Sequence, residues 1–260
     1  MKDINPNKPI ILGLSGKAVT GKTSVAESIV PKAAIETESS GISWDHIFFA
    51  LPLYELANIR KQILGTRKRT RQLYAIHDVI YDIFGGSAIG NVPDYEDMIN
   101  IVQQIYNMPI EPEGIKPRTF LQKAGDICRS HNELCFSEWA INKSKKLYND
   151  YTQEKQELDL INPFCVIISD VRFLNEAEAI KNQENGILIT YTASEEVRQN
   201  RMIQRDGMLM SEDQMNHISE KQIDDIIPLS DLVMDTSDMS VETQKGLTVE
   251  FVSSIVGTYA

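Results

Sequence analysis

The sequence has few cysteines and no cysteine cluster. Among its 260 residues only Cys128, Cys135 and Cys165 are cysteines, and no two of them form a Cys-x-x-Cys pair. Three thiols cannot all pair with one another, and this spacing offers no set of zinc ligands. We therefore expect reduced thiols, no structural zinc and a protein of the cytoplasm.

Long apolar runs and a surplus of positive charge are also missing. No stretch reaches the roughly 18 apolar residues of a membrane-spanning helix, and the opening MKDINPNKPI lacks the apolar core of a signal peptide. Lys and Arg number 26 against 37 Asp and Glu, and this net charge of −11 opposes general attraction to nucleic-acid backbones. We expect neither a membrane nor a nucleic acid as a partner.

The composition is that of a globular chain in which strands and helices alternate. Hydrophobic residues make up 42% of the chain and charged residues 24%, close to globular averages. Strands are expected at Pro9–Leu14, at PFCVIISD ending with Asp170, at ILITY after a helix stop at Gly186, and at DLVMD. This alternation predicts an α/β fold, a parallel sheet flanked by helices and joined by right-handed crossovers.

The middle of the chain is harder to interpret. The basic run GTRKRTRQ is typical of a solvated helix end or loop, and a place beside an anionic substrate is the alternative. From Asp78 to Pro117, glycines and prolines surround one helical piece, Tyr95–Tyr106. We interpret this segment as an insertion or a mobile subdomain.

A phosphate-binding motif follows the first expected strand. Residues 16–23 match G-x-x-x-x-G-K-[ST] in full, with a strand before them and a helix after them. Glycines let the backbone wrap an oxyanion, N–H groups at the helix start point at it, and the lysine reaches the β- and γ-phosphates. The residues expected to bind the nucleotide are Gly16, Lys17, Ala18, Val19, Thr20, Gly21, Lys22, Thr23 and Ser24.

A nucleoside triphosphate is therefore the expected ligand. The motif alone leaves open whether the triphosphate is hydrolysed, used as a signal or used to phosphorylate a substrate. A GTP-binding switch would need an N-K-x-D loop after a strand. The sequence NKSK at Asn142 lacks the aspartate and follows a helical stretch.

Asp170 and Arg172 lie at the end of the second apolar strand, where open α/β sheets bind ligands. The Asp170 carboxylate, together with the Thr23 hydroxyl, can hold Mg²⁺ or its waters, while Arg172 can neutralise phosphate. The alternative is structural: Asp170 caps the turn into the next helix, and Arg172 pairs with Glu176 or Glu178.

Arg198, Arg201 and Arg205 recur at steps of three and four, so they project from one helical face. A surface ladder with the glutamates of the same helix is one interpretation. The other is a mobile lid: Gly207 follows the arginine face, and closure would bring guanidinium groups over the transferred phosphoryl group.

A second polar helical face is formed by Arg118, Gln122, Gly125 and Arg129. The amide of Gln122 can bond a base edge, and the arginines can hold a monophosphate in a bidentate manner. A solvated helix face is the alternative. Trp139, soon after, could stack on a base or fill the core.

Taken together, these motifs resemble a known family. LGLSGKAVTGKTSVAE, FALPLYELA, PRTFLQKAGDICR, VIISDVRFLNEAEAI and RDGMLMSEDQMNHISE are similar, in this order, to characteristic blocks of the bacteriophage deoxynucleoside monophosphate kinases. That family shares the P-loop nucleoside monophosphate kinase fold. The chain departs from the family pattern at Gly125-Asp126-Ile127, where the family helix carries threonine or glutamate.

The resemblance implies reversible transfer of the γ-phosphoryl group of ATP to a deoxynucleoside monophosphate, assisted by Mg²⁺. It implies one domain, residues 1–260, with a helical acceptor-binding insertion at 54–160 and a lid at 194–222. It also implies roles for the residues above. The catalytic residues would be Lys22, Asp170, Arg172, Arg201 and Arg205, the metal ligands Thr23 and Asp170, and the acceptor-binding residues Arg118, Gln122, Arg129, Trp139 and Arg172.

Two other functions stay open from the sequence. One is a P-loop kinase of another small acceptor, such as dephospho-coenzyme A, and the other is a nucleotide-dependent regulator without kinase activity. The expected partners are small molecules, ATP and the acceptor, and a homodimer is left open.

Overall fold

The computed structural model describes residues 4–30, 41–62, 66–85, 92–156, 162–209 and 211–256. The chain divides into two units: a sheet unit, Met1–Phe48 with Lys143–Ala260, and a helical unit, Phe49–Asn142. The helical unit covers most of the insertion expected over residues 54–160 and begins slightly before it. The number of domains itself stays a prediction.

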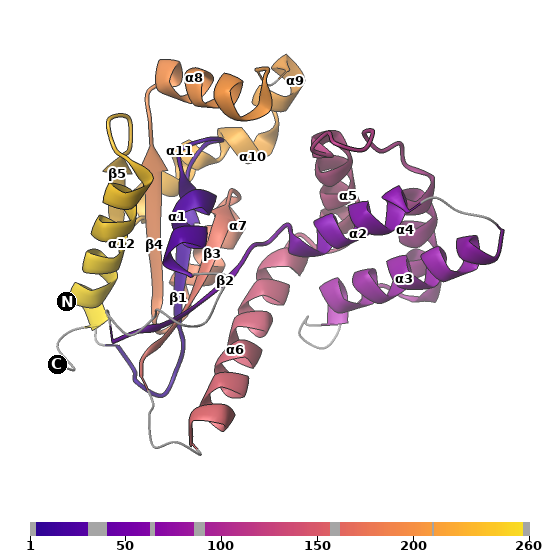
Figure 1. Ribbon diagram of the computed structural model, residues 1–260. Coiled ribbons are helices and arrows are strands. Elements are labelled where there is room, and N and C mark those ends of the chain that lie inside the picture. Colours follow the sequence, from indigo (N-terminus) through magenta and orange to yellow (C-terminus); the bar gives the residue numbers. More distant parts are fainter. Residues whose placement is uncertain are drawn as a thin grey trace. The chain divides into compact units, whose positions relative to one another are not determined.

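Five strands form the sheet in the order β2-β3-β1-β4-β5, and every neighbouring pair is parallel (Figure 1). The strands are β1 (Ile10–Ser15), β2 (Ser43–Ile47), β3 (Phe164–Val171), β4 (Gly186–Thr192) and β5 (Leu232–Asp235). The predicted α/β class, with a parallel sheet flanked by helices, is confirmed.

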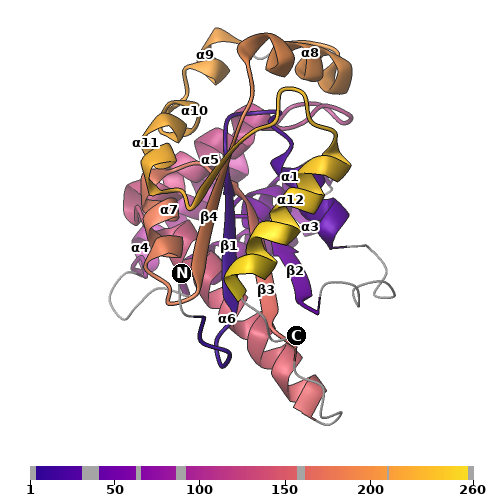
Figure 2. The ribbon, with the colours of Figure 1, turned by 90° about the vertical axis from the view of Figure 1, so that its left-hand side faces the viewer.

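Helices cover both faces of the sheet. Successive side chains of β1 point to opposite faces, so each face has apolar residues or close contacts for a helix to pack on. Leu12 and Leu14 lie in the core cluster with Val25 of helix α1 (Lys22–Ile29) and Val252 of α12 (Val241–Val256). Gly13 points the other way, toward α7 (Leu174–Lys181), where an added Cβ would stand 2.7 Å from Ile180 Cδ1. Figure 2 shows α1 and α12 together on one side of the sheet and α7 on the other.

The remaining helices of the sheet unit follow β4. Their bounds are α8 (Glu195–Asp206), α9 (Glu212–Met215), α10 (Ile218–Lys221), α11 (Ile223–Ile226) and the 3-10 helix η2 (Ile227–Leu229). Helix α8 begins where the Ser194 hydroxyl accepts a hydrogen bond from Val197 N–H, and it ends at Gly207, whose φ of 72° suits glycine. The helix thus begins and ends where its sequence predicts.

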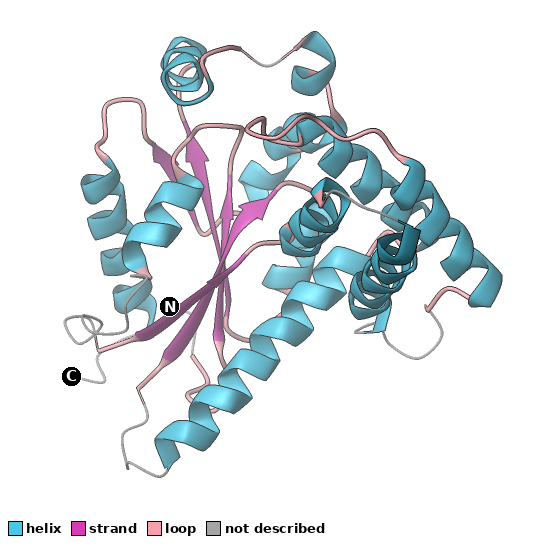
Figure 3. Cartoon of the chain, turned by 45° about the vertical axis from the view of Figure 1, so that its right-hand side comes forward, coloured by secondary structure: helices cyan, strands magenta, loops and turns pink. Residues whose placement is uncertain are grey.

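The helical unit holds α2 (Leu51–Lys61), α3 (Thr66–Gly85), α4 (Tyr95–Asn107) and α5 (Arg118–His131) (Figure 3). Helix α6 (Cys135–Gln156) begins in this unit and continues into the sheet unit. Helix α4 is capped by the Asp94 side chain and buries an apolar stripe at helical spacing. Within the described ranges, no helix combines the length and the apolar character that a bilayer span requires.

Two local predictions need correction. The segment after Asp78 is not irregular at once, because α3 continues to Gly85. Gly186 is the first residue of β4 rather than a helix stop. A Cβ at Gly186 would stand 1.8 Å from the carbonyl oxygen of Ile180, so the close approach of two backbones requires a glycine there.

Candidate functional site

The phosphate-binding loop leaves β1 in a conformation that favours glycine at two positions. Gly16 has φ 140° and Gly21 has φ 105°, both outside the range that most residues adopt. A Cβ at Gly16 would also stand 2.3 Å from the carbonyl oxygen of Tyr191. Among the described residues other than glycine, Val19 is the one with a positive φ, 60°. The motif glycines therefore shape the loop directly.

Lys22 begins helix α1 and is buried within the loop. Its ammonium group donates to the carbonyl oxygens of Gly16 at 2.5 Å and Lys17 at 2.8 Å, and it lies 3.3 Å from Thr20 Oγ1. Burial and, to a lesser extent, the positive charge of Arg172 lower the pKa of Lys22 to about 7, although the carboxylates of Glu220 and Asp170 oppose this shift. Because this pKa is near 7, the lysine is only partly protonated at neutral pH, and a bound anion would favour its charged form.

Oxygen donors of the kind that Mg²⁺ prefers lie at this end of the sheet unit. Thr23 and Ser24 are exposed in the first turn of α1, and Asp170 is the second-last residue of strand β3. The charge of Asp170 acts on Lys22, Arg172 and His46 alike. No group of three or more His, Cys, Asp or Glu forms a metal site among the described residues. The donor set fits a Mg²⁺ that is held mainly by phosphate oxygens and waters.

Arg172 follows β3 and is held by two carboxylates. Its backbone N–H donates to Glu176 Oε2 at 2.9 Å, and its Nη1 donates to Glu220 Oε1. The described hydrogen-bond partner of the guanidinium is thus Glu220, whereas Glu176, one of the two partners expected in the structural alternative with Glu178, accepts from the backbone N–H and acts on the guanidinium through its charge. Burial works to lower the pKa of Arg172, but Glu220 and Asp170 outweigh it, so the pKa lies above its ordinary value.

Glu220, on α10, is a site residue to which the sequence assigned no role. Its Oε2 accepts a hydrogen bond from the N–H of Ala18 in the phosphate loop at 3.0 Å, and the residue is 6% exposed. The sequence signals are its place near the end of the expected lid region, residues 194–222, and at the end of the block RDGMLMSEDQMNHISE. Its partners lie 48 and 202 positions away, beyond the reach of local patterns.

His46, at the end of β2, is a second such residue. One ring nitrogen lies 2.7 Å from the hydroxyl of Ser169, and burial lowers the pKa of the ring although Asp170 opposes this. The phosphate loop, Asp170, Arg172, Glu220 and His46 all belong to the sheet unit. They gather at the carboxyl ends of its strands, the edge where sheets of this class bind ligands.

The arginines of α8 have different environments. Arg201 donates from Nη2 to the carbonyl oxygen of Thr236 at 2.6 Å and lies 3.3 Å from its hydroxyl, so it holds α8 to the chain after β5. Arg205 forms paired hydrogen bonds to Asp206 near the end of the helix. Arg198 contributes to the lowered pKa of Lys22, so its charge acts on the phosphate loop. The lid role of these arginines stays a prediction.

The expected acceptor residues Arg118, Gln122 and Arg129 lie on α5 of the helical unit, all half-buried. Arg129 is 19% exposed at its side chain; its guanidinium lies 4.9 Å from the ring centre of Phe136 and 3.8 Å from Asp126. Ala124, Gly125 and Cys128 form the buried side of the helix. Gly125 is therefore buried, and it lies between Arg129 of the polar face and Leu53 of α2.

Trp139 lies in the interior of the helical unit. It is 6% exposed, and its indole N–H donates to Asp82 at 2.8 Å. A ring enclosed in this way offers little free surface to a base, so the structure supports the packing interpretation of Trp139 over the stacking one.

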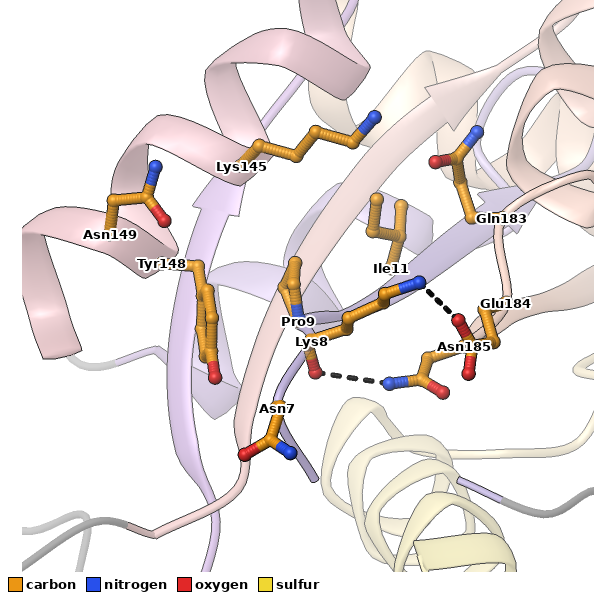
Figure 4. A pocket seen from close by; sticks show the side chains of 10 residues that line it. All are labelled: Asn7, Lys8, Pro9, Ile11, Lys145, Tyr148, Asn149, Gln183, Glu184 and Asn185. Atoms are coloured by element: carbon orange, nitrogen blue, oxygen red, sulfur yellow. Dashed lines mark hydrogen bonds and ion pairs between the residues drawn. The ribbon is translucent and has the colours of Figure 1, made fainter. Parts of the chain in front are cut away.

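A pocket of about 270 Å³ lies at the opposite, amino-terminal ends of the strands (Figure 4). Lys8, Tyr148, Gln183 and Glu184 are among its lining residues, and Lys8 is paired with Glu184. The pocket is separate from the phosphate loop, because the loop follows the carboxyl end of β1 and Lys8 precedes its amino end.

Comparison with known proteins adds little to this geometry. No protein-family model and no curated protein matches the sequence. The solved structures similar to this chain include the protein TT1252 from Thermus thermophilus, with 14% identity, a TM-score of 0.39 and coverage of 94% of this chain and 97% of that one. They also include a dephospho-CoA kinase from Campylobacter jejuni, with 14% identity, a TM-score of 0.39 and coverage of 95% and 96%. Similarity at this level carries no argument about activity or substrate.

Proposed function

We propose that this protein is a kinase that transfers the γ-phosphoryl group of ATP to the phosphate of a deoxynucleoside monophosphate. The observation that carries the proposal is the environment of Lys22. This lysine is buried at the end of a complete phosphate-binding motif, bonded to the loop carbonyls, with Arg172 and Asp170 in the same electrostatic cluster. Such an arrangement suits a group that must be charged when phosphates are bound.

In the proposed reaction an oxygen of the acceptor phosphate attacks the γ-phosphorus, and the bond from that phosphorus to the β-phosphate oxygen breaks. ADP leaves with the electron pair, and the acceptor becomes a diphosphate. Lys22 and Arg172 stabilise the negative charge on the transferred group, and the loop N–H groups hold the donor. Thr23 and Asp170 would hold a Mg²⁺ ion on the protein side, and the ion would supply positive charge that offsets the charge of the donor phosphates.

In this proposal the acceptor nucleotide binds to side chains of helix α5. Arg118 and Arg129 can hold a monophosphate, and Gln122 can bond a base edge, all three from one half-buried helix. The preference for deoxyribose comes from the sequence resemblance alone. Arg201 and Arg205 would act from the lid, with Arg198, whose charge acts on the loop.

A panel of acceptors tests the proposal. Purified protein with ATP and Mg²⁺ is offered each common deoxynucleoside and ribonucleoside monophosphate and, separately, dephospho-coenzyme A; nucleotide products are separated by ion-exchange chromatography. We expect a deoxynucleoside diphosphate from at least one acceptor, with one ADP formed for each. Lys22→Ala should stay folded and lose about 100-fold or more of this rate.

Two results would replace the proposal. Phosphorylation of dephospho-coenzyme A, without any diphosphate from the monophosphates, would assign the chain to kinases of another small acceptor. ATP binding without transfer to any acceptor would favour a nucleotide-dependent regulator.

A further inference from the structure

Glu220 joins two parts of the candidate site that are far apart in sequence. One carboxylate oxygen accepts the N–H of Ala18 in the phosphate loop at 3.0 Å, and the other accepts from Nη1 of Arg172. The side chain is 7% exposed. Because both oxygens are used and the group is buried, Glu220 fixes the guanidinium relative to the loop backbone.

This carboxylate is charged in the folded protein. Burial works to raise its pKa, but Arg172, the Ala18 N–H and Lys22 outweigh burial, so the pKa lies below the ordinary value. A negative charge beside a triphosphate site opposes nucleotide binding. Its presence there therefore calls for a role that offsets this repulsion.

Further hydrogen bonds hold the residues near Glu220 to the phosphate loop and to the chain around Arg172. Glu176 holds the backbone N–H of Arg172, so this arginine is fixed at both its backbone and its guanidinium. Two residues after Glu220, Gln222 Oε1 accepts from Leu174 N–H at 3.0 Å, and Asp224 pairs with Lys17 of the loop at 3.0 Å. The segment that carries Glu220 is thus bound to Arg172, to the chain just after it at Leu174, and to the loop.

We propose that Glu220 is a positioning residue that holds Arg172 in the orientation needed for phosphoryl transfer, an inference that rests on the proposed kinase function. The guanidinium has five N–H donors, and the described hydrogen bond to Glu220 uses one. The others can meet phosphate oxygens without a search among rotamers. An oriented cation contributes more to the transition state than a mobile one, because less reorganisation is needed at the moment of transfer.

The test separates catalysis from binding. Glu220→Gln keeps the shape of the side chain and removes its charge. We expect kcat to fall by about 10- to 100-fold, as for a catalytic group that is misplaced by about 1 Å. The Kd of a non-hydrolysable ATP analogue, measured by calorimetry, should stay equal or become lower, since an anion has been removed from the site. A merely structural role would instead lower the melting temperature and weaken both properties.

A double-mutant cycle shows whether Glu220 acts through Arg172. We expect Glu220→Gln to change kcat less than threefold, roughly, in a protein that already carries Arg172→Ala, because the oriented group is gone. The double variant should also melt above Arg172→Ala alone, since that single variant leaves a buried carboxylate without its partner. Asp225→Asn is the matched control: it removes the same charge from an exposed position on α11 and should keep the wild-type kcat.

Three outcomes overturn the proposal. A wild-type kcat in Glu220→Gln, while the wild-type protein transfers phosphate, overturns the positioning role alone. Tighter analogue binding with unchanged kcat would mean that Glu220 blocks the loop instead. Absence of transfer by the wild-type protein to every acceptor overturns the proposed function and this inference with it.

Discussion

Gly125 leaves the space that the guanidinium of Arg129 occupies. A Cβ at Gly125 would stand 2.7 Å from Arg129 Nη1 and 3.4 Å from Leu53 Cδ1. The first distance is too short for a real contact, so the guanidinium would have to move. The glycine in the middle of α5 is therefore explained by one side chain, and that side chain is an expected acceptor ligand.

Gly125→Ala should displace Arg129 while leaving the fold intact. Alanine favours the helix by about 1 kcal/mol over glycine, and the atom that must move is the end of a flexible side chain. We expect an unchanged or higher melting temperature together with a several-fold rise in the KM of the acceptor. The KM of ATP should change little. Both constants come from steady-state assays with one substrate varied at a time.

The control is Gly85→Ala at the end of α3. A Cβ there would meet Tyr81 at 3.6 Å, an ordinary contact. This variant should keep the wild-type KM for the acceptor. An unchanged acceptor KM in Gly125→Ala, with displacement of Arg129 verified by structure determination, would remove Arg129 from the acceptor site.

The sequence predicts those parts of the fold that depend on nearby residues. The phosphate loop is set by glycines at fixed positions, and α4, α5 and α8 are set by apolar spacing and by capping residues such as Asp94 and Ser194. The parallel sheet follows from alternation of strands and helices. These features appear in the structure close to their predicted bounds.

Pairings over long sequence distances were not predictable in this way. Arg172 meets Glu220, Arg201 meets Thr236, and Trp139 meets Asp82. Each pair is set by how elements pack, and charge or polarity alone allows many partners for an arginine or an indole. Sequence patterns therefore identified the arginines of the candidate site without identifying the residues that hold them.

Asp170→Asn should weaken the Mg²⁺-dependent turnover. Asparagine keeps the size of the side chain but removes the charge that would act on the metal and on Lys22. We expect a lower kcat and a higher Mg²⁺ concentration at half-maximal rate, measured by Mg²⁺ titration at fixed ATP. Glu178→Gln, an exposed change on α7, is the control for loss of one charge. If Asp170→Asn keeps both its rate and its Mg²⁺ requirement, Asp170 has a structural role only.

Replacing each of the two expected lid arginines, Arg201 and Arg205, should have different effects on the free energy of unfolding. Arg201→Ala removes hydrogen bonds to Thr236, so it should lower the free energy of unfolding by about 1 kcal/mol. Arg205→Ala removes a partly exposed pair with the adjacent Asp206 and should change stability little. If both act on the phosphoryl group in a closed lid, each should lower kcat more than it weakens binding of ATP alone. Denaturant unfolding and steady-state kinetics measure the two effects. A wild-type kcat in Arg205→Ala would favour the surface-ladder interpretation.

Lys22 should give the ligand-free protein a pH-dependent stability with a definite sign. Its pKa is about 7 in the folded protein and 10.5 as the ordinary value, which we take for the unfolded chain. Between these two pH values the unfolded chain binds a proton that the folded protein does not. The contribution of Lys22 to the free energy of unfolding must therefore rise with pH over this window, by up to roughly 1 kcal/mol per pH unit.

Below about pH 7 both states carry the proton, so this dependence disappears and the cost of burying a charged lysine is present in full. Lys22→Met is the matched variant, because it keeps a long unbranched side chain that cannot titrate. We expect the stability of the wild-type protein relative to Lys22→Met to increase as pH rises from 7 toward 10, measured by urea unfolding at each pH. Other titrating groups are common to both proteins and largely cancel in the difference. A difference that stays constant over this range would show that Lys22 keeps an ordinary pKa, and the buried, partly uncharged lysine would then have to be abandoned as a feature of the free site.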